Sequence, residues 1–167
     1  MRRIRYGMIG GGKGSFIGAV HRAAMRPDDG WDFVCGVLSS TSEKSKASAK
    51  AAGLADDRAY GPWAEMSEAE AQRDPADRME AVVIVTPNDV HAPAAEAALW
   101  AGFHVVCDKP LCTSLDEASA LERAQSETGL VFAVTYNYSG YPMVKQAKRM
   151  IADGELGPIR KVLVEYN

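Results

Sequence analysis

Apolar residues in this chain cluster into short runs, and between the runs they recur at the spacing of amphipathic helices. The clearest run is AVVIVT at residues 81–86, which predicts a buried strand of a parallel sheet. Gly53, Gly102 and Gly154 follow three of the helical segments, where helices commonly end. The pattern predicts strands at 5–9, 32–38, 59–60, 81–86, 103–107 and 130–135, and helices at 16–25, 43–52, 62–71, 90–101, 114–128 and 143–153.

Strands that alternate with helices along a chain are typical of βαβ units, which build a parallel sheet. The expected fold class is therefore α/β, with a doubly wound, mostly parallel sheet. The chain has 167 residues, which is enough to bury the core of a single domain of this kind.

The segment at 159–166 departs from this pattern. Val162, Val164 and Tyr166 recur at every second position, a period that suits a half-exposed strand of an antiparallel sheet. Two interpretations stay open, an edge strand of the same sheet and the first strand of a second domain that this chain lacks. We expect a first domain at 1–156 and the first strand of a missing α+β domain at 157–167.

A glycine-rich turn, IGGGKGSFIG at residues 9–18, follows the first predicted strand and precedes the first predicted helix. In this context glycines allow the backbone to approach a pyrophosphate closely, and the helix N-terminus favours the anion. The spacing departs from GxGxxG, because counting from Gly10 puts the small residue Ser15 at the third glycine position. Methyltransferases use similar turns, and a connection without a ligand is the other alternative. The predicted cofactor contacts here are Gly10, Gly12, Lys13, Gly14, Ser15, Phe16 and Ile17.

The end of the second predicted strand lacks the acidic residue that commonly holds the adenosine ribose of NAD. It reads Leu38-Ser39-Ser40-Thr41, and Lys44 follows. Hydroxyls and an ammonium can accept the 2′-phosphate of NADP, which a carboxylate would repel. We therefore predict cofactor contacts from Ser39, Ser40 and Lys44, and the balance favours NADP over NAD. Alternatively, the hydroxyls only cap the next helix and the lysine faces water.

Thr86, Pro87 and Asn88 follow the most apolar predicted strand, and His91 lies in the first turn of the next helix. Asn88 offers a donor and an acceptor at the carboxyl edge of the sheet, where open α/β sheets bind ligands. The helix dipole disfavours a cation at His91, so a local hydrogen bond is the alternative to a cofactor contact there.

Asp108, Lys109 and Pro110 follow the strand predicted at 103–107. An ammonium at the carboxyl end of such a strand projects into the ligand crevice, and the following proline restricts its backbone. A cation there would stabilise the alkoxide that develops when hydride leaves a carbinol carbon. For a Lys-Pro pair taken alone, a surface lysine in a loop is the alternative.

Taken together, the glycine turn, the motif at 86–91 and the motif at 108–110 resemble the N-terminal half of the glucose–fructose oxidoreductase / inositol dehydrogenase (Gfo/Idh/MocA) family, a Rossmann-type domain. The resemblance spans essentially the whole chain. It implies that Lys109 is a catalytic residue beside the nicotinamide and the substrate hydroxyl, and that Asn88 holds the nicotinamide ribose. It further implies substrate or ribose contacts from the stretch around Asn137.

The family's third motif is normally Glu-Lys-Pro, so Asp108 shortens the carboxylate arm by one methylene and puts its contact in doubt. In addition to the turn and the end of the second strand, the predicted cofactor contacts are Thr86, Pro87, Asn88, His91, Asp108, Lys109, Pro110 and Asn137.

The resemblance implies an NAD(P)-dependent oxidoreductase that acts on a hydroxyl of a sugar, inositol or related polyol. In this family a second domain supplies the general base, the sugar or polyol site and the oligomer interface, so we expect a homo-oligomer at full length. The present chain is expected to bind the dinucleotide with little turnover. The alternatives are a non-catalytic dinucleotide-binding module and an assembly module that pairs through the strand at 159–166.

Composition and charge mainly exclude other classes of protein. The net charge is −3, and both signs are spread along the chain without the basic stripe of a nucleic-acid-binding protein. Cys35, Cys107 and Cys112 lack metal-ligand spacing, so free thiols in a reducing cytoplasm are expected rather than a disulfide or a metal site. No secretory signal and no run of membrane-spanning length is visible, which predicts a cytoplasmic protein without a membrane partner.

Overall fold

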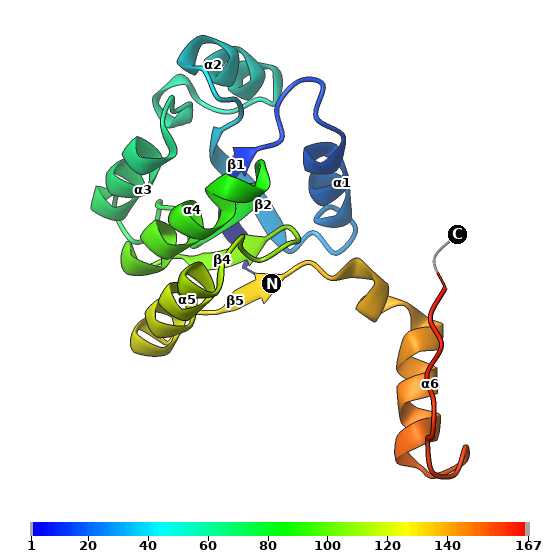
Figure 1. Ribbon diagram of the computed structural model, residues 1–167. Helices are drawn as coiled ribbons and strands as arrows, with labels where there is room; N and C mark the ends of the chain where they lie inside the picture. The colour runs from blue at the N-terminus through cyan, green and yellow to red at the C-terminus, as the bar shows by residue number, and fades with distance from the viewer. Residues whose placement is uncertain (1, 166–167) are drawn as a thin grey trace. The chain divides into compact units, whose positions relative to one another are not determined.

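The computed structural model describes residues 2–165. They divide into two units, one that ends at Thr135 and one that begins at Tyr136. The first unit contains a five-stranded parallel sheet in the order β2-β1-β3-β4-β5 (Figure 1). The strands are β1 (Ile4–Gly10), β2 (Trp31–Val37), β3 (Ala81–Val85), β4 (His104–Cys107) and β5 (Phe132–Val134). The helices of this unit are α1 (Phe16–Ala24), α2 (Ser42–Ala51), the short 3-10 helix η1 (Asp56–Arg58), α3 (Trp63–Gln72), α4 (Asn88–Trp100) and α5 (Leu115–Thr128).

Helices cover both faces of this sheet, and strand alternation divides the buried side chains between the two faces. On one face Met8 of β1 and Val83 of β3 pack with Ile17 of α1. On the other face Ile84 of β3 packs with Leu99 of α4. Figure 1 shows α1 on one side of the sheet and α3, α4 and α5 on the other. The α/β class and the parallel, Rossmann-type sheet expected from the sequence are confirmed.

Each helix predicted from the sequence is present, and the strands differ in two places. The short strand expected at 59–60 is reduced to a single bridge between Gly36 and Ala59. The strand expected at 130–135 is limited to Phe132–Val134. Both segments lie at the edges of the sheet, where only one neighbour supplies hydrogen bonds.

The second unit contains the 3-10 helix η2 (Asn137–Gly140) and helix α6 (Pro142–Ala152). Its residues 159–165 have no regular secondary structure, and Tyr166, the end of the strand expected at 159–166, lies outside the described residues. No partner strand for this segment is present among residues 2–165, and the assignment of 157–167 to a second domain stays a prediction. No helix among the described residues is long and apolar enough to cross a membrane.

Candidate functional site

The carboxyl ends of β1, β3 and β4 lie next to one another at one edge of the sheet. Gly10 pairs with Val85 in the register of β1 and β3, and Ile84 pairs with Cys107 in the register of β3 and β4. The structure therefore brings the three motifs singled out in the sequence to one edge, the place where open α/β sheets bind ligands.

The glycine loop, residues 10–15, turns sharply between β1 and α1. Gly10 and Gly11 have φ angles of +87° and +76°, a region that other residues rarely adopt. A Cβ atom on Gly10 would lie 2.7 Å from the Val85 carbonyl oxygen, so a side chain there would push β1 and β3 apart. Gly14, at φ +86°, faces open space instead, and an added Cβ would meet nothing within 4 Å. The outer side of the loop is thus free for a ligand.

The N-terminus of α1 opens onto this loop without a side-chain cap. Ser15 occupies the N-cap position, but its hydroxyl makes no capping hydrogen bond, and the first turn carries no acidic residue. Phe16, the first residue of the helix, is 82% exposed. The free backbone N–H groups and the positive end of the helix dipole together form an anion-binding end.

Close packing of α1 on the loop depends on Gly18, which the sequence interpretation did not include among the site residues. We expected Ser15 to fill the third glycine position of the fingerprint. In the structure a Cβ on Gly18 would overlap the backbone of Gly11, so Gly18 is the residue that lets α1 approach the loop. It was already visible in the sequence, at the end of the run IGGGKGSFIG.

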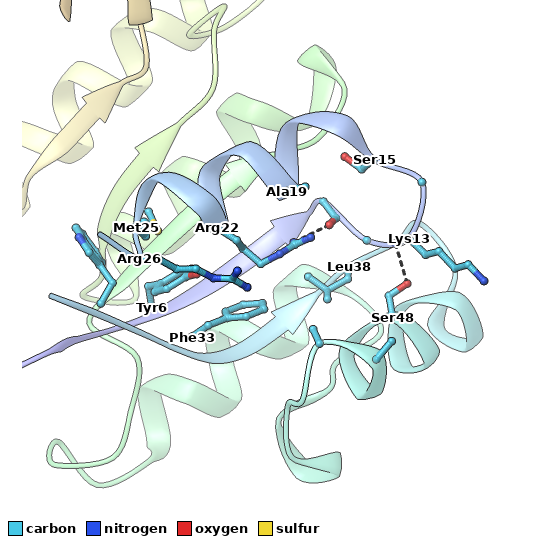
Figure 2. Close-up of a pocket in the computed structure, with 16 residues that line it drawn as sticks. Tyr6, Lys13, Ser15, Ala19, Arg22, Met25, Arg26, Phe33, Leu38 and Ser48 are labelled. Atoms are coloured by element: carbon cyan, nitrogen blue, oxygen red, sulfur yellow. Dashed lines mark hydrogen bonds between the residues drawn. The ribbon is translucent and has the colours of Figure 1, made fainter. Parts of the chain in front are cut away.

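The opposite side of the loop rests on the end of β2 and on α2. A Cβ on Gly12 would overlap the Leu38 carbonyl oxygen. The backbone N–H of Lys13 donates a hydrogen bond to Ser48 Oγ of α2 at 3.3 Å (Figure 2). The Lys13 side chain is exposed.

The end of β2 presents free hydroxyls, and no acidic residue lies between the strand and α2. Ser40 and Lys44 are exposed and Ser39 is half-buried, and neither serine hydroxyl is hydrogen-bonded to another described residue. Thr41 is the N-cap of α2, but its side chain makes no capping bond. Glu43, in the first turn of α2, is the first acid after the strand. These hydroxyls are therefore available to a ligand and do not cap the helix.

His91 joins the loops that follow β3 and β4. Its ring is 1% exposed, with Nδ1 2.7 Å from the Pro110 carbonyl oxygen and Nε2 2.9 Å from the Thr86 carbonyl oxygen. This agrees with the local hydrogen-bonding alternative considered for His91 from the sequence. A direct cofactor contact from this buried ring stays a prediction, whereas its hold on both loops is visible in the geometry.

Asp108 is fixed by its neighbours on two sides. Its backbone N–H donates to the Ile84 carbonyl oxygen at 2.9 Å. The Thr135 hydroxyl donates to its Oδ1 at 2.6 Å, and His21 Nε2 of α1 lies 3.8 Å from the same oxygen. The shorter carboxylate thus still finds partners, while Lys109 next to it is exposed and precedes a cis peptide bond to Pro110.

Thr86 at the end of β3 carries an unsatisfied polar atom. Its Oγ1 is buried and is the one such side-chain atom without a hydrogen-bond partner among residues 2–165. Buried hydroxyls without partners are rare, because the lost hydration costs about 1–3 kcal/mol. At this edge of the sheet the Thr86 hydroxyl can therefore donate to, or accept from, a group that binds there. Pro87 is the N-cap of α4 and Asn88 its exposed first residue.

Cys107, beside these loops, is not a nucleophile at neutral pH. Burial, followed by the nearby Asp108 carboxylate, raises the pKa of its thiol to about 12. Within residues 2–165 there is also no group of three or more His, Cys, Asp or Glu side chains that could hold a metal ion. Asn137, the remaining predicted contact, belongs to the second unit, so its role stays a prediction.

The fold and the loops at this edge agree with what family comparison shows. A family described as oxidoreductases with an NAD-binding Rossmann fold (GFO_IDH_MocA) matches residues 4–136 of the chain. The chain belongs to this family. The resemblance inferred from the glycine turn and the motifs at 86–91 and 108–110 is confirmed.

Similar proteins are oxidoreductases that are much longer than this chain. An oxidoreductase from Sinorhizobium meliloti is 50% identical, with a TM-score of 0.88 over 94% of this chain and 43% of that one. An inositol dehydrogenase homolog from Azotobacter vinelandii, complexed with NADH and myo-inositol, is 41% identical, with a TM-score of 0.90 over 95% of this chain and 41% of that one. Levoglucosan dehydrogenase from Pseudarthrobacter phenanthrenivorans is 32% identical over 95% of this chain and 40% of its own length. The chain therefore spans about two fifths of the length of these relatives.

Proposed function

We propose that this chain is the dinucleotide-binding part of an oxidoreductase that transfers hydride between NAD(P) and a hydroxyl of a sugar, inositol or related polyol. The observation that carries the proposal is the meeting of the glycine loop, Thr86–Asn88 and Lys109 at one edge of the sheet, beside an uncapped helix N-terminus. The substrate class rests on the relatives, one bound to myo-inositol and one named for levoglucosan.

The residues at this edge fit a dinucleotide. The open side of the loop at Gly14 and the uncapped N-terminus of α1 suit a pyrophosphate, which needs backbone donors and a positive dipole. The orphaned Thr86 hydroxyl and the exposed Asn88 amide lie where the ribose at the nicotinamide end would be held. A bound nicotinamide ring supplies the hydride acceptor or donor for the reaction.

Lys109 is assigned the electrostatic role in the reaction. Its ammonium, placed beside the substrate hydroxyl, lowers the energy of the alkoxide that forms as hydride departs. His91 positions Lys109 indirectly, because the His91 ring is bonded to the carbonyl of the next residue, Pro110. On the other side of Lys109 in the sequence, Asp108 is held by its hydrogen bond from Thr135. We assign the general base, most substrate contacts and the oligomer interface to a second domain of the full-length protein. This domain is proposed to begin after residue 156.

The end of β2 supports NADP as the preferred coenzyme. A 2′-phosphate would meet the free hydroxyls of Ser39 and Ser40 and the Lys44 ammonium, with no carboxylate directly at the strand end. Titration of the chain with NADPH and with NADH, followed by nucleotide fluorescence, tests this. The Lys44→Glu substitution is expected to weaken NADPH binding about tenfold and to leave the affinity for NADH nearly unchanged. Lys50→Glu, exposed on the same helix, is the matched control. No binding of either nucleotide at millimolar concentration would refute the proposed function.

The catalytic assignment is tested in the whole oxidoreductase with a panel of sugars and inositols. The Lys109→Met substitution is expected to lower kcat by a factor of about 10²–10³. The affinity for the dinucleotide should change little, because the ammonium acts mainly on the transition state. The present chain alone is expected to bind the dinucleotide with little turnover. An unchanged kcat in the Lys109→Met enzyme would show that this lysine has no catalytic role.

A further inference from the structure

A pocket of about 640 Å³ lies behind the glycine loop, in the groove between α1 and α2 (Figure 2). Tyr6, Trp31 and Phe33 of β1 and β2 form its floor, and Arg22 of α1 and Arg26, which follows the end of α1, form one wall. The volume is within the range of small-molecule sites, about 300–1,000 Å³. Nothing in the proposed hydride transfer uses this pocket.

The aromatic end of the pocket is separate from the edge assigned to the dinucleotide. Tyr6 and Phe33 face each other in the register of β1 and β2, near the amino ends of the strands. Tyr6 precedes Gly10 by four residues on β1, which is about 13 Å along an extended strand. At its other end the pocket is lined by residues 11–15 of the glycine loop, which it shares with the proposed pyrophosphate site, but by none of the residues at 39–44, 86–91 or 107–110.

The floor of the pocket is aromatic. The rings of Tyr6 and Phe33 are stacked, with centroids 5.0 Å apart and planes 19° apart. Trp31 meets the Tyr6 ring edge-on at 5.9 Å and 85°. Tyr6 is buried beneath this group, whereas Trp31 and Phe33 are partly exposed and give the floor an apolar surface that suits an aromatic ligand.

The charges around the pocket favour an anion. Lys13, Arg22 and Arg26 line it, and no acidic residue does. Neither arginine forms an ion pair with a described residue, and Arg22 Nη1 donates instead to the Gly11 carbonyl oxygen at 2.8 Å. Asp32 is exposed and, by strand alternation, points away from the aromatic floor. Uncompensated guanidinium groups beside apolar walls bind carboxylates and phosphates strongly.

Tyr6 adds an unused polar group. It is 3% exposed, yet its hydroxyl makes no hydrogen bond with a described residue. Burial raises the pKa of this phenol, so it stays protonated and able to donate to a bound acceptor. Because the Tyr6 oxygen is not among the fully buried unpaired atoms of the described residues, it remains accessible from the pocket that Tyr6 lines, where a ligand can bond to it.

We propose that this pocket is a second ligand site, which binds a small organic anion with a planar aromatic body independently of the dinucleotide. The aromatic floor holds the body of the ligand. Arg22, Arg26 and the Tyr6 hydroxyl bind its anionic group. The site does not depend on the proposed oxidoreductase activity, since none of its side chains takes part in hydride transfer.

Titration of the ¹⁵N-labelled chain with 2-naphthoate, followed by amide chemical shifts, tests the proposal. Saturable shifts are expected at the amides of Tyr6, Arg22, Arg26 and Phe33, and they should persist in the presence of saturating NADPH. The neutral analogue 2-naphthamide is expected to bind about tenfold more weakly. Shifts confined to 86–91 and 107–110, displacement by NADPH, or equal binding of the neutral analogue would each overturn the proposal. Failure of NADPH to bind would affect only the proposed function.

Two variants locate the site within the pocket. Arg26→Gln, at an exposed arginine without an ion pair, and Tyr6→Phe, which removes only the hydroxyl, should each raise the Kd for 2-naphthoate several-fold. The matched control is Arg123→Gln on α5, whose side chain is 64% exposed and lies outside the pocket. The dispersion of the amide spectrum reports whether each variant is folded. If both variants are folded and bind 2-naphthoate with an unchanged Kd, the assignment of the ligand site to this pocket is wrong.

Discussion

At the scale of single residues, Glu70 is the most consequential side chain outside the site. It has no exposed surface, and its carboxylate accepts hydrogen bonds from Arg58, from the Tyr60 hydroxyl and from the Met79 backbone N–H. Arg73 is a second cation on the same carboxylate. These contacts join α3 to the segments before it and to the start of β3. Burial is the first of the causes that raise the pKa of Tyr60 to about 12, so it remains a donor in this network.

Glu70→Gln should destabilise the protein by about 3 kcal/mol, because it removes the buried counter-charge of the Arg58 guanidinium and leaves it only the more exposed Asp77 carboxylate at 3.3 Å. Urea unfolding followed by circular dichroism measures the free energy of unfolding. Glu68→Gln, at an exposed position of the same helix, is the control and should change that free energy by less than about 0.5 kcal/mol. Equal effects of the two substitutions would show that the network contributes nothing.

The three cysteines should differ in reactivity. With a pKa of about 12 for Cys107, about one thiol in ten thousand is ionised at pH 8, and burial likewise raises the pKa of Cys35. Cys112 is the one partly exposed thiol among them. Iodoacetamide at pH 8 should therefore modify Cys112 first, and the other two only after denaturation, as peptide mass spectrometry would show. Rapid modification of Cys107 in the folded protein would contradict its placement.

At the scale of elements, the junction of β1 and α1 depends on two glycines in contact. Gly18→Ala should separate α1 from Gly11, lower the free energy of unfolding by about 1–3 kcal/mol and weaken dinucleotide binding. Gly30→Ala is the control, because its added Cβ would make only an ordinary contact with Asp28 at 3.9 Å. Thermal unfolding and nucleotide titration of both variants give the comparison. Normal affinity in Gly18→Ala would show that the loop tolerates a displaced helix.

Local pattern predicted the elements well, because each signal lies within the element itself. The helix predicted to begin at 114 is one case, since the Ser114 hydroxyl accepts a hydrogen bond from the backbone N–H of Glu117, three residues along the chain. The packing role of Gly18 could not be read with the same certainty, because the close approach to Gly11 is a tertiary contact across a turn of unusual length. The pocket over Tyr6 was equally hidden, since its floor and its wall come from separate elements.

At the scale of the whole molecule, the sheet and the buried hydrophobic residues of the described chain all precede Tyr136. The three candidate loops lie in this first unit, at the carboxyl edge of β1, β3 and β4. A ligand that spans them stabilises the folded unit by an amount that grows with the logarithm of its concentration, about 2.7 kcal/mol at a hundredfold excess over Kd. The same ligand should slow local opening only at the loops that it contacts.

Hydrogen exchange with saturating NADPH should therefore slow the peptides at 10–18, 86–92 and 107–111 together. The peptide at 73–79, which precedes β3 and lies at the amino edge of the sheet, should exchange at an unchanged rate. Mass spectrometry after brief labelling separates these local effects from global unfolding, because only the local ones are seen at short times. Protection of 10–18 without 107–111 would mean that the pyrophosphate end binds while Lys109 stays away from the nicotinamide. In that case the chain would still bind a nucleotide, but the loop after β4 would have no part in the reaction.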